Sequence, residues 1–191
     1  MNVLEHLEPK SVFRFFEEMC AIPHGSRNTK AVSDWCADFA RARGLEYHQD
    51  GDNNIIIIKE AAPGYEAAPP VILQGHLDMV CEQTADCQKD MSREGLDLAV
   101  DGDFVYAKGT TLGGDDGIAV AMALALLDAE GLPHPRLEAV FTVDEEIGLL
   151  GAASIDVTPL KGRQMLNLDS EAEGIFTVSC AGGNTSACLL P

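Results

Sequence analysis

The spacing of apolar residues predicts two amphipathic helices at the start of the chain. Over residues 12–20, apolar side chains recur at intervals of three and four, and Pro23 ends the pattern. The same spacing recurs over residues 32–40 and ends at Gly44. Stripes of large apolar side chains are typical of the buried face of a helix, so we expect both helices to pack onto a core.

Short apolar runs farther along the chain predict β-strands. Residues 54–58 form a continuous, largely β-branched run, which is typical of a strand covered on both faces. Residues 82–103 are polar and acidic, and we expect them to form a long irregular loop. The further strands that we expect lie at residues 71–74, 104–107, 137–143, 165–168 and 175–179.

Two more helices are predicted among these strands. Residues 117–130 are apolar around most of the helix circumference and precede Gly131, which indicates a buried helix. A shorter helix is expected at residues 146–154. The order of helices and strands indicates an α/β protein, a three-layer sandwich around a mixed, largely parallel central sheet.

The composition narrows the class of protein. The 191 residues are 46% hydrophobic, which suffices for one core or at most two small domains and excludes a disordered acidic tail. The 31 acidic and 13 basic residues give a formal net charge of −18, which argues against nucleic acid or an anionic membrane as a partner. The six cysteines include no CxxC pair, so we expect structural thiols.

The sequence carries no pattern typical of a membrane span or an export signal. The longest mostly apolar stretch, residues 117–127, is shorter than a bilayer span. The N-terminal residues include acids where a signal peptide has a basic region and an apolar core. We therefore expect a cytoplasmic protein.

Candidate catalytic chemistry gathers at the ends of predicted strands. Three strands lead directly into short segments that contain acids, one of them with a histidine, and a glycine-rich turn with two acids opens the buried helix. Because open α/β sheets build their sites at the carboxyl ends of strands, we expect these side chains to meet. The four segments are Gly75–Asp78, Asp144–Glu146, Asp169 and Gly113–Gly117.

Each of these features alone has a simpler interpretation. A His-x-Asp pair usually lies on the surface, a Gly-Asp-Asp-Gly turn can cap a helix, acids suit a helix start, and Asp169 can be a turn residue. Together, however, several carboxylates beside one histidine repel each other unless cations compensate them. A pair of divalent ions is the natural compensation, and imidazole with carboxylates suits zinc, with manganese or cobalt as substitutes.

A family resemblance rests on the same residues. Residues 72–81 (ILQGHLDMVC) resemble the first metal-binding motif of the aminoacyl-histidine dipeptidases, also called Xaa-His or cytosolic nonspecific dipeptidases. These enzymes belong to the co-catalytic zinc metallopeptidases. The resemblance extends along essentially the whole chain. The other segments that are similar to the family are residues 21–26, 100–117, 142–151 and 166–171.

The resemblance implies a role for each residue of the expected site. His76 and Asp169 correspond to ligands of a first zinc ion, Glu146 to a ligand of a second, and Asp115 to the carboxylate that bridges both. No cofactor other than the metal ions is implied. The resemblance also implies a cis peptide bond after the bridging Asp115.

Two further acids have implied roles in the reaction itself. Glu145 is similar to the general base that activates the attacking water. Asp78 resembles the acid that orients the ring of His76, in keeping with the usual hydrogen bond from a metal-bound histidine to a carboxylate.

The resemblance implies that the parent protein hydrolyses dipeptides of the aminoacyl-histidine type, such as carnosine, and forms a homodimer. Members of the family are much longer, with a lid and dimerisation domain and a late histidine that ligates the second zinc. We therefore expect residues 1–185 to be the N-terminal segment of the catalytic domain, and residues 186–191 to be the start of the lid domain or a truncated end. Two alternatives stay open: another amidohydrolase of the clan, such as a deacetylase or carboxypeptidase, or a truncated, non-catalytic metal-binding fragment.

Overall fold

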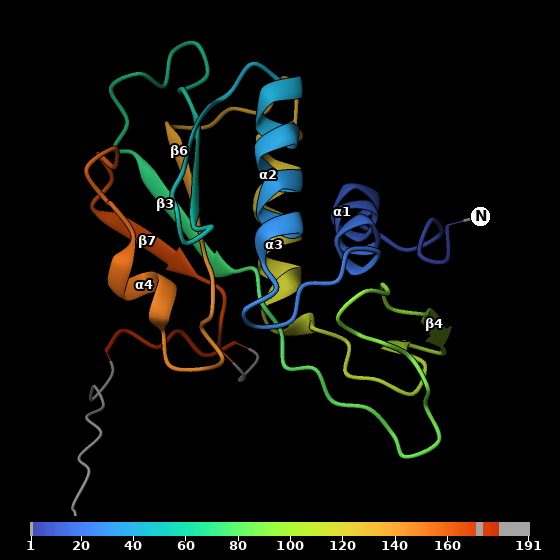
Figure 1. Cartoon of the computed structure of the whole chain (residues 1–191). Coiled ribbons are helices and arrows are strands. Elements are labelled where there is room, and N and C mark those ends of the chain that lie inside the picture. Colours follow the sequence, from blue (N-terminus) through green and yellow to red (C-terminus); the bar gives the residue numbers. More distant parts are fainter. Residues whose placement is uncertain (1, 171–173, 180–191) are drawn as a thin grey trace, which may run out of the picture.

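The computed structural model describes residues 2–170 and 174–179 and contains one five-stranded sheet with helices on both sides (Figure 1). The segment 186–191, expected to begin a lid domain or to be a truncated end, lies outside the described residues. The strands of the sheet follow the order β1-β2-β6-β3-β7. Their bounds are Glu46–Gln49 for β1, Ile55–Lys59 for β2, Val71–His76 for β3, Leu137–Thr142 for β6 and Gln164–Asn167 for β7.

The pairing of these strands confirms a mixed sheet. β1 pairs with β2 and β2 with β6 in antiparallel fashion, whereas β3 pairs with β6 and with β7 in parallel. The parallel part, β6-β3-β7, carries the strand ends that the candidate chemistry follows. The described pairings thus divide equally between the two directions.

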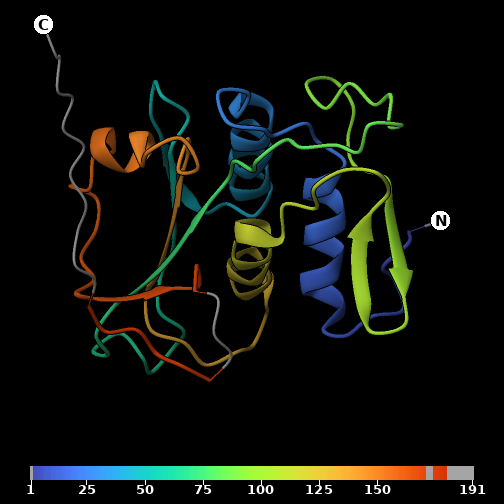
Figure 2. The same cartoon turned by 90° about the horizontal axis from the view of Figure 1, so that it is seen from below.

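Helices cover the two faces of the sheet unequally. α1 (Lys10–Cys20), α2 (Lys30–Ala42) and α3 (Gly114–Asp128) lie on one face, and the short α4 (Leu150–Ser154) lies on the other (Figures 1 and 2). The isoleucines of β2 explain how both faces are filled. Alternate side chains enter the large core under α1–α3 and a small core that includes Ile155, so the prediction of a strand covered on both sides is confirmed.

The two N-terminal helices form as their apolar spacing predicts. Every apolar residue of the first stripe is buried in α1, and the second stripe is buried apart from a partly exposed Trp35. The ring of Phe15 packs edge-on against Phe39 at 5.4 Å between centroids. Gly44, with φ of +66°, follows α2 in a left-handed conformation that other residues adopt only with strain.

The prediction of an irregular loop at residues 82–103 was wrong for its last residues. Residues 98–101 form β4, which pairs with β5 (Phe104–Ala107) in a separate two-stranded sheet beside α1 (Figure 2). Asp101 and Phe104 are paired, so Gly102 and Asp103 make the hairpin turn. A Gly-Asp pair between two short runs is itself a hairpin signal, and it outweighs the polar character of the strand.

The predicted helix at residues 146–154 begins later than expected. The helix α4 starts only at Leu150, because Gly148 and Leu149 have positive φ angles of 116° and 59° that interrupt a right-handed helix. The strand expected at residues 175–179 does not form in the described part of the chain. Its large apolar side chains are mostly exposed, with Phe176 at 90%, and an unpaired strand gains no stability from packing.

The buried helix is nearly as expected. α3 begins at Gly114, but the backbone of Asp115 and Asp116 is not helical, so the regular turns start close to the predicted Gly117. Most of its residues are buried, yet Met122 and Leu126 are about 40% exposed on one face. No helix in the described residues has both the length and the apolar character needed to cross a membrane.

Candidate metal centre

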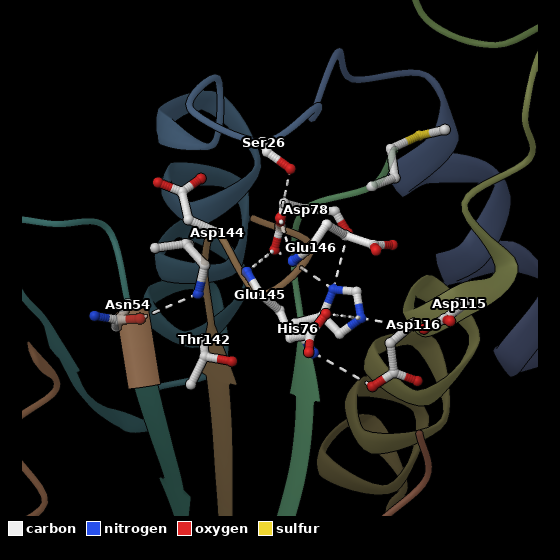
Figure 3. A network of polar contacts seen from close by, with 12 residues as sticks. Ser26, Asn54, His76, Asp78, Asp115, Asp116, Thr142, Asp144, Glu145 and Glu146 are labelled. Carbon is white, nitrogen blue, oxygen red and sulfur yellow. Dashed lines mark hydrogen bonds and ion pairs between the residues drawn. The ribbon is translucent and has the colours of Figure 1, made fainter. Parts of the chain in front are cut away.

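The candidate site lies at the carboxyl ends of β3 and β6, beside the start of α3 (Figure 3). His76 is the last residue of β3, and Glu145 and Glu146 stand on the turn that follows β6. Asp115 and Asp116 stand at the start of α3, which packs on β3. Parallel pairing of β3 with β6 brings the two strand ends to one edge, so residues far apart in the sequence meet there.

His76 stands at the centre of the site and is 1% exposed. Its Nε2 lies 3.1 Å from Oδ1 of Asp115 and 3.8 Å from Oε2 of Glu145. Its Nδ1 lies 2.9 Å from the main-chain oxygen of Asp78 and 3.4 Å from Oδ1 of the same residue. Burial lowers the pKa of His76, but the facing carboxylates of Asp78, Asp116 and Asp115 outweigh burial and raise this pKa to about 9.

Three of the four expected metal ligands converge on one point. One donor atom each from His76, Asp115 and Glu146 lies within 4.8 Å of the other two. An imidazole nitrogen with carboxylate oxygens is a donor set that zinc and related divalent ions accept. The residues therefore fit a divalent metal ion.

Asp169 lies outside this group of three. It follows β7 and lines a cavity of about 280 Å³ together with Asp115 and Ile118. Burial, followed by the charge of Asp115 and a hydrogen bond to it, raises the pKa of Asp169. The fourth expected ligand is thus a neighbour of Asp115 across this cavity.

Asp78 is the most completely bonded acid of the site. Its carboxylate accepts hydrogen bonds from the hydroxyl of Ser26 at 2.8 Å and from the main-chain N–H groups of Glu145 and Glu146 at 3.0 and 3.4 Å (Figure 3). Burial alone raises the pKa of Asp78, but the contact with His76 and these hydrogen bonds lower it overall. Asp78 thus links the histidine to the turn that carries the two glutamates.

The two glutamates behave differently from Asp78. Burial raises the pKa of Glu145 and of Glu146, and neighbouring acids add to this effect against the opposing charge of His76. Both side chains are partly buried. Carboxylates held close to other carboxylates favour a cation or a proton between them.

Asp116 belongs to the expected turn at residues 113–117, but the sequence reasoning inferred no role for its side chain. It is 1% exposed, and its Oδ2 accepts the main-chain N–H of His76 at 3.3 Å. Burial, with repulsion from Asp169 and Asp115, raises its pKa to about 7 in spite of the opposing charge of His76. Gly75 makes room for this carboxylate, because a Cβ at position 75 would lie 2.7 Å from Asp116 Oδ2. A glycine inside a strand, directly before His76, was the available signal.

Ser26 and Asn54 were also missed as members of this network. Ser26 belongs to the segment 21–26 that resembles the dipeptidase family, but no role was inferred for its hydroxyl. Asn54 accepts the main-chain N–H of Val143 and lies beneath the turn that carries the glutamates. The peptide bond between Asp115 and Asp116 is cis, as the resemblance implies.

The fold and this donor set define the class of protein, an α/β protein with a candidate metal centre at its strand ends. The model of Peptidase family M20/M25/M40 matches residues 72–183, which is more than half of the chain and includes every strand-end segment of the site. The chain therefore belongs to this peptidase family. Proteins of the family depend on metal ions, typically zinc.

Individual relatives confirm the resemblance to dipeptidases. The chain is 38% identical over 183 residues to the cytosol non-specific dipeptidase of Escherichia coli K12, a match that covers 96% of this chain. The solved aminoacylhistidine dipeptidase of Vibrio alginolyticus is also 38% identical and superposes with a TM-score of 0.86 over 90% of this chain. A tripeptidase from Staphylococcus aureus, 22% identical with a TM-score of 0.71 over 85% of this chain and 44% of its own, shows the same fold.

The matched relatives are much longer than this chain. The chain spans 38% of the length of the Escherichia coli protein and 35% of the Vibrio alginolyticus protein. The comparison therefore establishes the fold and the family of this chain, and the activity of a longer protein is not part of it.

Proposed function

We propose that this chain carries the metal-binding part of a dipeptidase, with residues 1–185 forming the N-terminal segment of its catalytic domain. The observation that carries the proposal is the convergence of His76, Asp115 and Glu146 within 4.8 Å at the strand ends of an M20/M25/M40 fold. The 38% identity to two named dipeptidases supports dipeptides as substrates.

We assign the metal ligands as the family resemblance implies. His76 and Asp169 would hold a first zinc ion, Glu146 a second, and Asp115 would bridge the two. The closeness of Asp115 to His76 and its shared cavity with Asp169 support this assignment. When bound, such ions lower the pKa of a water molecule toward about 7 and polarise the carbonyl group of the substrate. Manganese or cobalt are expected substitutes for zinc.

Glu145 is proposed as the general base. Its Oε2 lies 3.8 Å from Nε2 of His76, so the carboxylate borders the donor atoms without belonging to the group of three. Glu145 takes a proton from the attacking water at a carboxylate oxygen and returns it to the leaving amine nitrogen. Its raised pKa favours this exchange, because a base whose pKa is closer to neutral also serves as an acid in the second step.

Asp78 is proposed to orient the ring of His76. Its main-chain oxygen and its carboxylate both face Nδ1, so Nδ1 donates a proton to Asp78 and Nε2 is the nitrogen left for a metal ion. The same carboxylate holds the backbone of Glu145 and Glu146. One buried acid thereby fixes the ligand and the base relative to each other.

The proposed substrate and compartment follow the names of the two dipeptidase relatives, and the proposed assembly follows the family resemblance. We infer that the whole protein cleaves dipeptides of the aminoacyl-histidine type, such as carnosine, acts as a homodimer and works in the cytoplasm. The second candidate is a metal-binding chain without activity of its own. The observation that favours it is the span of the match, which is only 38% of the Escherichia coli relative.

Paired glutamine variants test the proposal on the chain itself. Zinc titration calorimetry of the unmodified chain is expected to show binding that His76→Ala abolishes. Glu146→Gln, which removes a ligand charge, is expected to weaken zinc binding, whereas Glu145→Gln leaves it nearly unchanged. In a preparation that cleaves dipeptides, Glu145→Gln lowers the rate by about 10²- to 10⁴-fold.

The outcomes separate the assignments. Loss of zinc by Glu145→Gln with retention by Glu146→Gln reverses the roles of the two acids. Zinc bound without measurable cleavage of any dipeptide supports the non-catalytic candidate. An unmodified chain that binds no more zinc than His76→Ala contradicts the metal centre.

A further inference from the structure

Glu145, the proposed base, and Glu146, a proposed metal ligand, stand on a turn whose position depends on its neighbours. The turn closes on itself through hydrogen bonds from Gly148 and Leu149 to the oxygen of Glu145, and from Gly151 to the oxygen of Val143. These bonds fix the shape of the turn but not its place on the sheet. Its place depends on contacts with neighbouring strands.

One of these contacts comes from the residue Asp78, just after β3, and the second comes from Asn54, just before β2. Asp78, just after β3, accepts the N–H groups of Glu145 and Glu146. On the other side, Oδ1 of Asn54 accepts the N–H of Val143 at 3.1 Å (Figure 3). The turn is therefore held between an acid of the metal centre and an amide that lies away from it.

The strand register explains why Asn54 is needed. β2 begins at Ile55, which pairs with Phe141 of β6, so the antiparallel ladder ends two residues before Val143, which in the same register would face Asn53. The side chain of Asn54 replaces the missing ladder bond. Both Asn54 and Val143 are almost fully buried, at 1% and 2% exposure, so no water is available as a substitute partner.

The amide of Asn54 is held in one orientation. Its Nδ2 donates to Oδ2 of Asp50 at 2.8 Å and to the hydroxyl of Ser154 at 3.4 Å, which turns Oδ1 toward Val143. A side chain at this place must donate to a carboxylate and accept from an N–H group at the same time. Asparagine does both, and neither aspartate nor leucine does.

Gly151, at the far end of the turn, also lies directly against the side-chain amide of Asn54. A Cβ at position 151 would clash with Oδ1 of Asn54 and with the backbone of Val143. The start of α4 therefore packs directly against the hydrogen bond between Asn54 and Val143.

We propose that Asn54 is a positioning residue for Glu145 and Glu146, which acts on the metal centre only through the backbone of Val143. This inference rests on the proposed metal centre and extends it to a residue that touches none of the donor atoms. Loss of the Val143 hydrogen bond lets the turn shift, and the shift changes the geometry of Glu146 against His76 and Asp115.

The test uses Co²⁺ as the metal and reads its visible absorption spectrum at saturation, together with its affinity for the full chain. Asn54→Asp sets a second carboxylate against Asp50, and repulsion between the two carboxylates moves the acceptor oxygen at position 54 away from the N–H of Val143. We expect it to weaken Co²⁺ binding by about 10- to 100-fold, the range for partners outside the ligand shell. We also expect it to alter the spectrum of the bound ion.

A polarity swap provides the rescue. Asn54→Asp combined with Asp50→Asn reverses donor and acceptor between the two positions and keeps an oxygen on Val143. We expect it to restore most of the affinity and the original spectrum. The matched control is Ser154→Ala, which removes a neighbouring contact of the same amide but not the Val143 bond, and which should leave both readouts unchanged.

Each outcome bears on a different claim. If Asn54→Asp lowers thermal stability but leaves the saturated spectrum and the affinity unchanged, Asn54 has only a structural role and the inference is overturned. If the swap does not restore the spectrum, the proposed hydrogen-bond mechanism fails. If the unmodified chain binds no Co²⁺, the metal centre itself is refuted, and the role of Asn54 with it.

Discussion

Two clusters of charged side chains lie at opposite ends of β6, each around a buried member, and their charges are compensated in different ways. At the start of the strand, Glu138 is fully buried and accepts hydrogen bonds from Arg136 at 2.7 Å and from the N–H groups of Lys161 and Gly162. Arg136 also pairs with Glu60. Burial raises the pKa of Glu138, but these partners outweigh burial and lower it. We call these residues, Arg136, Glu138 and Glu60, the Arg136 cluster.

At the other end of β6 lies the His76 cluster, which comprises His76, Asp78, Asp115, Asp116, Glu145, Glu146 and Asp169. It contains six acids and one histidine. Except for Asp78, whose hydrogen bonds satisfy it, each acid with a shifted pKa has it raised by burial and by other acids. In the Arg136 cluster the buried Glu138 is paired with Arg136, whereas in the His76 cluster six acids face one histidine. Charged side chains that stabilise a fold are paired with opposite charges of the same protein, whereas the charged side chains of a ligand site are not.

The strongest test of the comparison removes the acid of the balanced cluster. Glu138→Ala leaves Arg136 buried without its main partner and frees two N–H groups. We expect a loss of about 3–5 kcal/mol in the free energy of unfolding, measured by urea titration. Zinc affinity of the folded fraction should change little. A loss below about 1 kcal/mol contradicts the structural role of the pair, and Glu138→Gln, which keeps an acceptor, is the milder control.

The second test measures how zinc affinity at the His76 cluster depends on pH. The pKa of His76 is raised to about 9, so a proton occupies the histidine at neutral pH and a metal ion must displace it. We expect the apparent zinc affinity to rise with pH between 6 and 8 by up to about tenfold per unit for each proton released. Calorimetry in buffers of different ionisation enthalpy counts these protons. An affinity independent of pH contradicts a role for His76 as a ligand.

Neutralising one acid of the His76 cluster is expected to change the free energy of unfolding least, and to raise it where most substitutions of buried residues lower it. The folded-state pKa of Asp116 is about 7, above its usual value near 3.8, so its contribution to stability falls as pH rises from about 4 through 7. In a chelator, Asp116→Asn is expected to stabilise the chain at pH 8 by about 1–3 kcal/mol, and by little at pH 5. Urea unfolding at the two pH values measures this difference.

The matched control for that variant lies in the same cluster. The pKa of Asp78 is lowered, so its charge stabilises the fold at pH 8 and Asp78→Asn should destabilise it. Equal destabilisation by Asp116→Asn and Asp78→Asn would mean that the acids of the site are not in excess.

The sequence predicted the parts of this molecule that repeat a regular pattern. The apolar stripes of α1 and α2 and the isoleucine run of β2 follow from side-chain burial alone, and the structure confirms them. The strand β5 was predicted, but β4, its hairpin pairing with β5 and the late start of α4 were missed, because they depend on single turn residues such as Gly102 and Leu149. Local backbone conformation leaves little trace in hydrophobic spacing.

The candidate site was accessible to sequence reasoning for a different reason. Acids at strand ends stand out where an apolar run stops, so the segments of the site could be found from the pattern. The family resemblance then implied His76, Asp115 and Glu146 as ligands, and the structure brings their donor atoms together. The supporting residues Asp116 and Asn54 could not be named, since their importance comes from burial and from partners distant in the sequence. Pairs such as Asn54 and Val143 become visible only once the strand register is known.

The exposed apolar side chains of the edge strand β7 constrain any segment that pairs with it. Its Met165 and Leu166 are 59% and 52% exposed, and in the described residues its only strand partner is β3. Leu166 pairs with Leu73 of the helix-covered core, and Met165 pairs with Ile72 of the opposite, smaller core. An apolar edge without charge or proline is a template for a further strand. Any segment that pairs with β7 must therefore present apolar side chains on both of its faces.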